Sequence, residues 1–166
     1  MRMTVIVVMG VSGSGKTTIG TALARALDVE YAEADSFHPK ANIDKMTAGH
    51  PLTDEDRAPW LEAIAGWIRE HQDGGGVVTS SALKRRYRDV LRTGGNVWFA
   101  HLHGDREILA ERMKSRSGHF MPVSLLDSQL ADLEPLEPDE PGARFDIRET
   151  PAAITDAALT AFRERS

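Results

Sequence analysis

The sequence predicts an α/β fold in which helices cover both faces of a parallel β-sheet, so that the domain has three layers. The chain has 166 residues, about the length of one domain. Short apolar, β-branched runs typical of buried strands alternate with longer segments of helical periodicity. This alternation favours parallel strands joined by helical crossovers, and ligands of such sheets bind at the carboxyl ends of the strands.

The element boundaries follow from hydrophobic periodicity and from capping and turn residues. Strands are expected at residues 3–9, 29–34, 77–80, 97–102 and, more weakly, 144–147. Helices are expected after Gly10, over residues 54–71, 83–92 and 105–115, and from Pro151 onward. Thr53 and Asp56 have the spacing of a capping box. The stretch from residue 116 to about residue 142 is rich in proline and acids and is expected to be irregular.

The composition is that of a folded domain, with 41% apolar and 27% charged residues. The longest strongly apolar run, Val5–Met9, is far shorter than the roughly 20 residues that cross a bilayer, and the first residues lack the features of a signal peptide. Cysteine is absent, which excludes disulfides, thiolate zinc and a cysteine nucleophile. A net charge of −5 disfavours nucleic acid as a partner. We therefore expect a cytoplasmic protein that binds neither membranes nor nucleic acid.

A glycine-rich motif with the pattern of a phosphate-binding loop follows the first expected strand. Its candidate ATP-binding residues are Gly10, Val11, Ser12, Gly13, Ser14, Gly15, Lys16, Thr17 and Thr18. Glycines let successive backbone N–H groups turn toward a phosphate, and the next helix adds its positive end. Lys16 can reach the β- and γ-phosphates, and the Thr17 hydroxyl can bind Mg²⁺. A chance glycine-rich turn is the plainer alternative, but the strand–loop–helix setting favours ATP and Mg²⁺ as cofactors.

Carboxylates that could act opposite the phosphates follow the second expected strand, because the third ends without one. They are Glu33 and Asp35. Our hypothesis is that Asp35 is catalytic and orients the acceptor hydroxyl, accepts its proton or supports the metal shell. A polar loop is the plainer alternative. His38 is a candidate to bind substrate or to form hydrogen bonds within its own loop.

Two clusters of basic residues stand out in this acidic protein. Lys84, Arg88 and Arg92 recur every four residues and therefore share a face of the expected helix. Like charges at this spacing repel each other and destabilise the helix. An anion bound on this face would neutralise the repulsion. A solvated surface is the plainer alternative. Arg112 and Arg116 repeat the spacing on the next helix.

Longer strings of residues resemble the gluconokinase family of small phosphate-loop kinases, which is related in fold to shikimate and adenylate kinases. The similarity covers nearly the whole chain. Beyond residues 10–17, it rests on residues 42–46, 119–122 and 125–129 and on three longer strings: Asp35-Ser-Phe-His38-Pro39, Gly49-His-Pro51-Leu-Thr-Asp54-Glu-Asp56-Arg57-Ala-Pro59-Trp60-Leu61 and Ser81-Ala-Leu-Lys84-Arg-Arg-Tyr87-Arg88-Asp-Val-Leu-Arg92.

The resemblance implies a five-stranded sheet of the nucleoside-monophosphate-kinase type, in the order 2-3-1-4-5, within a single domain spanning residues 1–166. It also implies a substrate-side helical insertion near residues 37–73 and a lid near residues 115–135. The implied reaction is phosphorylation of the 6-hydroxyl of D-gluconate by ATP with Mg²⁺, usually in a homodimer. Carried over by position, Lys16 and Asp35 are catalytic, Arg112 and Arg116 contact ATP, and the sugar acid meets Asp35, His38, Arg57, Lys84, Arg88 and His119.

Two positions depart from the family pattern. Ala34 stands where the family usually has glycine, which would change the loop if that position required a positive φ. Ser80 precedes Ser81 where the family commonly has cysteine.

Other functions stay open at this point. A shikimate- or nucleoside-monophosphate-type kinase would share the phosphate loop but would not account for the longer strings. A non-catalytic nucleotide-binding switch would bind ATP without acceptor-dependent release of ADP. A nucleic-acid-binding module, suggested only by the basic helix, is disfavoured by the net charge and by an aromatic content of 6%.

Overall fold

The computed structural model describes residues 3–11, 13–50, 52–115 and 124–165. Its centre is a five-stranded sheet in the order β2-β3-β1-β4-β5, and every pair of neighbouring strands is parallel. This confirms the expected fold class and strand order. The strands are β1 (Val5–Met9), β2 (Glu30–Glu33), β3 (Gly76–Thr79), β4 (Val97–His103) and β5 (Gly142–Asp146).

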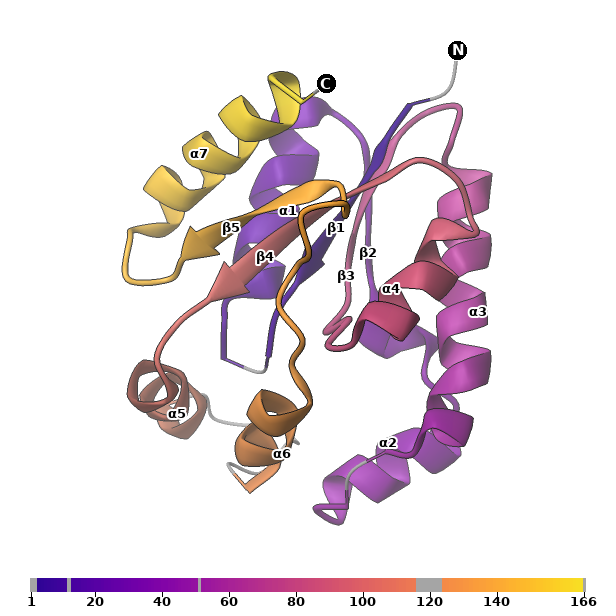
Figure 1. Cartoon of the computed structure of the whole chain (residues 1–166), viewed down its shortest axis with the longest axis vertical. Coiled ribbons are helices and arrows are strands. Elements are labelled where there is room, and N and C mark those ends of the chain that lie inside the picture. The colour runs from indigo at the N-terminus through magenta and orange to yellow at the C-terminus, as the bar shows by residue number, and fades with distance from the viewer. Residues whose placement is uncertain (1–2, 12, 51, 116–123, 166) are drawn as a thin grey trace.

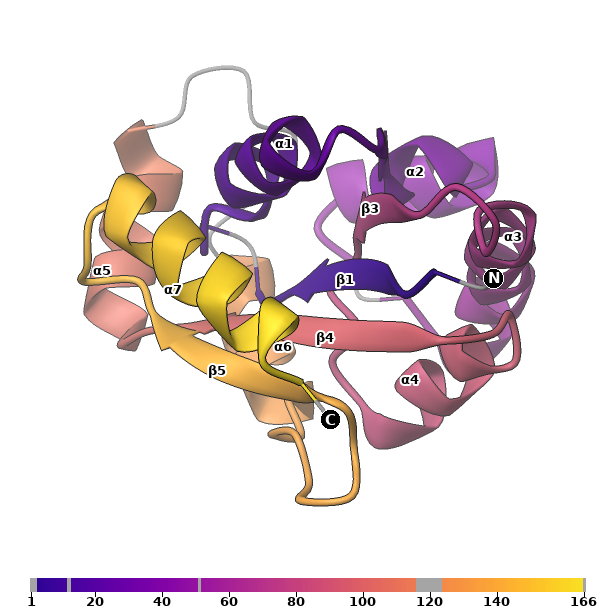
Figure 2. The same ribbon diagram turned by 90° about the horizontal axis from the view of Figure 1, so that it is seen from above.

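Helices form the two outer layers. Figures 1 and 2 show α1 and α7 on one face of the sheet and α3 and α4 on the other, whereas α2, α5 and α6 lie near the carboxyl ends of the strands. The helices are α1 (Lys16–Leu27), the 3₁₀ helix η1 (Ala34–Phe37), α2 (Lys40–Thr47), α3 (Asp54–Glu70), α4 (Arg85–Arg92), α5 (Arg106–Ser115), α6 (Ser124–Asp132) and α7 (Pro151–Arg163). No helix in the described residues has both the length and the apolarity needed to traverse a bilayer.

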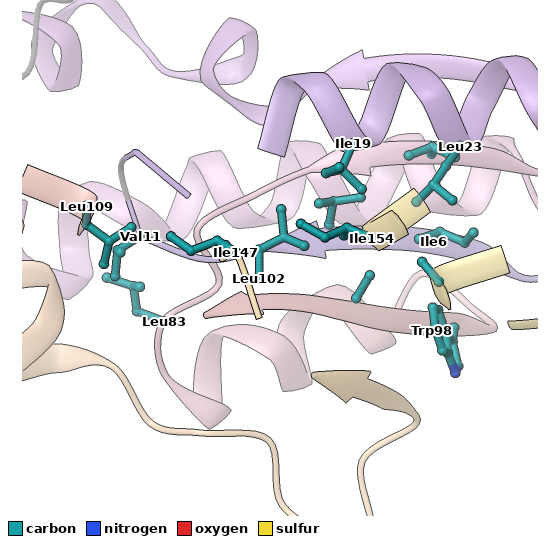
Figure 3. Packing of buried hydrophobic residues seen from close by; sticks show 14 of the residues in the cluster. Ile6, Val11, Ile19, Leu23, Leu83, Trp98, Leu102, Leu109, Ile147 and Ile154 are labelled. Atoms are coloured by element: carbon teal, nitrogen blue, oxygen red, sulfur yellow. The ribbon is translucent and has the colours of Figure 1, made fainter. Parts of the chain in front are cut away.

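The two faces of the sheet bury separate hydrophobic cores because successive side chains of a strand point to opposite faces. Ile6 and Val8 of β1 pack in the cluster that includes Ile19 and Leu23 of α1, several of whose members are drawn in Figure 3. The alternate β1 residues Val5, Val7 and Met9 pack in the cluster formed with α3 and α4. Burial on both faces explains why β1 is continuously apolar.

Local signals fixed several helix ends as expected. The Thr53 hydroxyl accepts a hydrogen bond from the Asp56 backbone N–H and the Asp56 carboxylate accepts one from the Thr53 N–H, so the capping box is present. Pro151 opens α7, and the Thr150 side chain caps it. By contrast, α4 begins two residues later than expected, because Ala82 has a φ of 44° and Lys84 is extended. Helix α6 lies in the stretch expected to be irregular.

A buried ion pair fastens α4 to the segment before β5. The guanidinium of Arg88 donates from Nε and Nη2 to the Glu140 carboxylate, at 2.5 and 3.0 Å, and both side chains are fully buried. Its Nη1 donates to the backbone carbonyl of Ala82 at 2.9 Å. The expectation that Lys84, Arg88 and Arg92 form one anion-binding face was therefore wrong, since Arg88 is interior while Arg92 is exposed.

Replacement of Glu140 by alanine should lower the free energy of unfolding by about 3–5 kcal/mol, because it leaves the Arg88 charge buried without its partner. Urea unfolding of purified variants measures this. Glu137→Ala is the matched control, since Glu137 makes an exposed pair with Arg85, and exposed ion pairs contribute little. Equal losses in the two variants would contradict the structural role assigned to the Arg88–Glu140 pair.

His101 on β4 is a buried titratable group with no hydrogen-bond partner at either ring nitrogen among the described residues. It is 1% exposed. Burial, together with the nearby charges of Arg144 and His103, lowers the pKa of His101 to about 4. Between pH 6.5 and 4 the unfolded chain therefore binds a proton that the folded chain does not, so this residue destabilises the fold as the pH falls.

The contribution of His101 predicts a pH-dependent difference between the wild type and His101→Leu. From pH 7 to pH 5, the unfolding free energy of the wild type should fall by about 2 kcal/mol more than that of the variant, since roughly 1.4 kcal/mol accompanies each pH unit between the two pKa values. Urea titrations at the two pH values measure both slopes. Parallel slopes would show that His101 does not carry this dependence.

Candidate active site

The turn between β1 and α1 is packed so closely that only glycine fits at two of its positions. A Cβ on Gly10 would lie 2.7 Å from the Leu102 carbonyl oxygen, and one on Gly13 would lie 2.9 Å from the Leu109 carbonyl oxygen. Both residues also have positive φ, at 154° and 84°. The turn is therefore held against β4 and α5, and the glycines add no side chain of their own that would obstruct a phosphate. Ser12 lies outside the described residues.

Polar groups of this turn suit a phosphate. The Ser14 hydroxyl is buried and has no hydrogen-bond partner among the residues that the structure describes. Gly15 is the N-cap of α1, so the positive end of that helix faces the turn. Lys16 Nζ donates to the carbonyls of Gly10 and Val11, at 2.9 and 3.2 Å, and therefore lies across the turn. The sequence prediction of a cradle thus agrees with its geometry.

Oxygen donors gather at the start of α1. The exposed Thr17 hydroxyl donates to the Glu33 carboxylate, and the Tyr31 hydroxyl donates to the same oxygen at 2.8 Å. Burial and this carboxylate raise the pKa of Tyr31 above its usual range, so the phenol keeps its proton. A hydroxyl beside a carboxylate is a donor set that fits Mg²⁺. In the sequence, Glu33 was named beside Asp35 but received no role of its own; its position as the last residue of β2 was the available signal. Thr18 is exposed beside Thr17.

Asp35 and His38, the candidates to bind the acceptor substrate, lie in and directly after η1. The backbone of Asp35 belongs to η1, and its side chain is outside what the structure describes. His38 stacks on Trp60 with ring centroids 4.2 Å apart, and its Nδ1 is 3.2 Å from the Asn42 amide nitrogen. His38 thus forms contacts within its own region, one of the two roles expected for it.

The guanidinium of Arg57 forms hydrogen bonds through Nη1, whereas its Nε–Nη2 edge has no hydrogen-bond partner among the described residues. Its Nη1 donates to the Leu52 carbonyl at 2.9 Å and to the Tyr87 hydroxyl at 3.0 Å, and its guanidinium lies 5.1 Å from the centroid of the Tyr87 ring. The Tyr87 hydroxyl in turn donates to Asp54 at 2.5 Å. None of the described residues accepts a hydrogen bond from the Nε–Nη2 edge of Arg57, so this edge can take a carboxylate in bidentate fashion.

The remaining basic candidates have different surroundings. Lys84 is the N-cap of α4, and its Nζ lies 3.9 Å from the carboxylate of Asp132 on α6. Arg88 was expected to bind the sugar acid, but it is saturated by Glu140 and backbone carbonyls in the interior and holds the turn that precedes Lys84. Arg112 lies beside the phosphate loop: a Cβ on Gly15 would be 3.9 Å from its Nη1. Arg116 and His119 fall outside the described residues.

Comparisons with known proteins now decide the family. A family model described as an AAA domain matches residues 6–121. A gluconokinase of Gluconobacter oxydans is 47% identical over 161 residues, covering 95% of this chain and 90% of that protein. The thermosensitive gluconokinase of Escherichia coli is 46% identical, covering 90% of this chain and 82% of the relative. The chain belongs to the gluconokinase family.

Solved structures place the gluconokinase fold of this chain among the phosphate-loop kinases. A gluconokinase from Sinorhizobium meliloti superposes with a TM-score of 0.89 at 46% identity, covering 96% of this chain and 91% of that one. An unliganded sugar kinase from Janibacter gives a TM-score of 0.92 at 52% identity, covering 97% and 95%. Shikimate kinase from Aquifex aeolicus, with a TM-score of 0.66 at 14% identity and 95% coverage of both chains, shares the fold.

The two departures from the usual gluconokinase pattern have local explanations. Asp28 and Ala82 are the non-glycine residues with positive φ in the described chain, so the position of Ala34 does not require glycine. The Ala34 carbonyl accepts a hydrogen bond from Trp60. Ser80 is buried, and its hydroxyl has no hydrogen-bond partner within the described ranges, so a side chain of cysteine's size would fit the same interior position.

Proposed function

We propose that this protein transfers the γ-phosphoryl group of ATP to the 6-hydroxyl of D-gluconate, producing 6-phosphogluconate and ADP. One observation carries the proposal: the glycine-lined turn has Lys16 across it and contains a Ser14 hydroxyl that finds no hydrogen-bond partner in the described part of the chain. This turn belongs to a chain whose near full-length relatives are gluconokinases. No comparable observation favours a shikimate- or nucleoside-monophosphate-type reaction, because the likeness to shikimate kinase extends to the fold alone.

On the phosphate side, the proposal gives each group a charge-stabilising or positioning role. The backbone N–H groups of residues 10–17 and the start of α1 hold the phosphates. Lys16 leaves the Gly10 and Val11 carbonyls to contact the transferred group, and Arg112 adds positive charge from α5. Thr17, with Glu33 behind it, would hold Mg²⁺, which when bound neutralises charge on the phosphates. Arg116, which lies outside the described residues, is also proposed to contact ATP.

On the acceptor side, the sugar acid needs a cation for its carboxylate and a proton acceptor at its 6-hydroxyl. Arg57 is the best carboxylate ligand among the candidates because its Nε–Nη2 edge is open and its orientation is fixed by Tyr87. Lys84 and His38 are further candidate contacts. We assign Asp35 to the acceptor hydroxyl, as its orienting group or base. His119, which lies outside the described residues, is also proposed to contact the sugar acid.

The proposed arrangement includes an acceptor-binding insertion over residues 37–73, which contains α2 and α3, and a lid over residues 115–135, which contains α6. Closure of the lid would exclude water and favour transfer to the sugar over hydrolysis of ATP. The homodimer and the cytoplasmic location stay predictions of the family resemblance and of the sequence, respectively.

The direct test is ADP release from Mg·ATP with gluconate, related sugar acids, shikimate and nucleoside monophosphates as acceptors. Turnover should require gluconate, and Lys16→Ala should lose it while keeping the circular-dichroism spectrum of the wild type, because the lysine supplies charge to the transfer and its hydrogen bonds lie at the β1–α1 turn. Turnover with AMP alone, or full activity of Lys16→Ala, would refute the proposal.

Replacement of Arg57 by alanine should raise the KM for gluconate at least about tenfold, since it removes a charge-assisted bidentate contact, and should leave the KM for ATP within about twofold. Steady-state kinetics with each substrate varied in turn provides both values. Arg69→Ala is the matched control, because Arg69 is exposed near the other end of the same helix. A larger change in the KM for ATP than for gluconate would move Arg57 out of the acceptor site.

A further inference from the structure

Trp60 connects the acceptor helix to the segment that carries Asp35. It is 3% exposed, and its indole Nε1 donates to the Ala34 carbonyl oxygen at 2.7 Å. The same indole stacks on the His38 ring, with centroids 4.2 Å apart and planes inclined by 11°. One side chain of α3 therefore contacts the residue directly before Asp35 and a residue three positions after it.

Asn42 adds a second connection. It is 3% exposed, and its amide nitrogen lies 3.2 Å from His38 Nδ1 and donates to the Asp56 carbonyl at 2.8 Å. Because an amide NH₂ only donates, His38 Nδ1 is the acceptor, and the neutral ring carries its proton on Nε2. Asn42 thus fixes both the tautomer of His38 and the place of α2 against the first turn of α3.

These contacts add to the others that hold η1: the Ser36 hydroxyl donates to the Glu33 carbonyl at 2.7 Å, and Ala34 and Phe37 pack in the cluster formed with α3 and α4. η1 is a four-residue 3₁₀ helix, and such short helices have poor hydrogen-bond geometry. Arg57 lies on α3 one turn before Trp60, so the same helix bears the proposed carboxylate ligand and the Trp60 contact. The Trp60–His38–Asn42 set therefore contributes the polar and stacking contacts that place the Asp35 segment relative to Arg57.

We infer that Trp60 and Asn42 are positioning residues of phosphoryl transfer: they hold the Asp35 segment in register with the helix that binds the sugar acid. This inference rests on the proposed function. Its physical basis is that transfer depends on alignment, and a displacement of about 1 Å can reduce the rate by about 100-fold. The set touches the acceptor segment and not the phosphate loop, so its loss should change kcat much more than the KM for ATP.

The chain supplies a matched pair of variants for the test. Trp67 also lies on α3 and also stacks on a histidine, His71, at 3.8 Å, but its indole N–H makes no hydrogen bond within the described residues. Trp60→Phe and Trp67→Phe therefore delete the same atoms from the same helix, and only Trp60→Phe removes a hydrogen bond to the Asp35 segment. Comparing their unfolding midpoints separates lost stability from lost positioning.

Trp60→Phe should reduce kcat with gluconate at least about tenfold, with the KM for ATP within about twofold of the wild type, whereas Trp67→Phe should keep kcat within about twofold. Equal kcat values in the two folded variants would overturn the inference. If Trp60→Phe does not fold, Asn42→Ala takes its place with the same expected pattern, and wild-type kcat in that variant would overturn it.

The proposed function can fail separately from this inference. If the wild type phosphorylates a different acceptor, the gluconate assignment is wrong, and the ratio of kcat values for Trp60→Phe and Trp67→Phe is measured with that acceptor. A ratio near one would then refute the positioning role, and a ratio of about one-tenth or less would support it. A wild-type protein without transfer to any acceptor would refute both.

Discussion

The close approach of the β1–α1 turn to its neighbours is the constraint on which the site depends. Leu102 of β4 and Leu109 of α5 place carbonyl oxygens where a side chain at Gly10 or Gly13 would begin. The backbone of the turn is thereby held close to β4 and α5, and glycine at these positions keeps side chains from blocking the approach of an anion to its N–H groups. This explains how a protein with a net charge of −5 can present a positive site: the attraction is local and comes from oriented peptide groups, a helix terminus and Lys16.

The proposed acceptor-binding part of the site is held differently, by side-chain interactions between secondary-structure elements. Arg57 is oriented by Tyr87, the Ala34 carbonyl is held by Trp60, and the turn before Lys84 is held by Arg88. The basic start of α4 is balanced by acids that precede β5, with Glu140 buried against Arg88 and exposed acids against Arg85. In the proposed site, the phosphates thus bind to a turn held by backbone packing, whereas the acceptor binds to residues whose positions depend on a few side-chain contacts.

Sequence reasoning succeeded where a residue's role is set by its neighbours in the chain. The Thr53–Asp56 capping box is a local pattern of this kind, and the phosphate loop is another. It failed for Arg88, because a four-residue spacing of charges shows which residues share a helix face but not what packs against that face; the partner, Glu140, lies 52 positions away. The contact between Glu33 and Thr17 could not be predicted for the same reason, since it joins the end of β2 to the start of α1.

The central claim is that the β1–α1 turn holds the triphosphate while α3 presents Arg57 to a sugar acid facing it. A crystal structure with a non-hydrolysable ATP analogue, Mg²⁺ and gluconate tests it most directly. The account predicts the β- and γ-phosphates within residues 10–17, Lys16 Nζ detached from the Gly10 and Val11 carbonyls, and the gluconate carboxylate on the Nε–Nη2 edge of Arg57. Phosphates bound elsewhere, or gluconate lodged away from Arg57 and the turn, would contradict it.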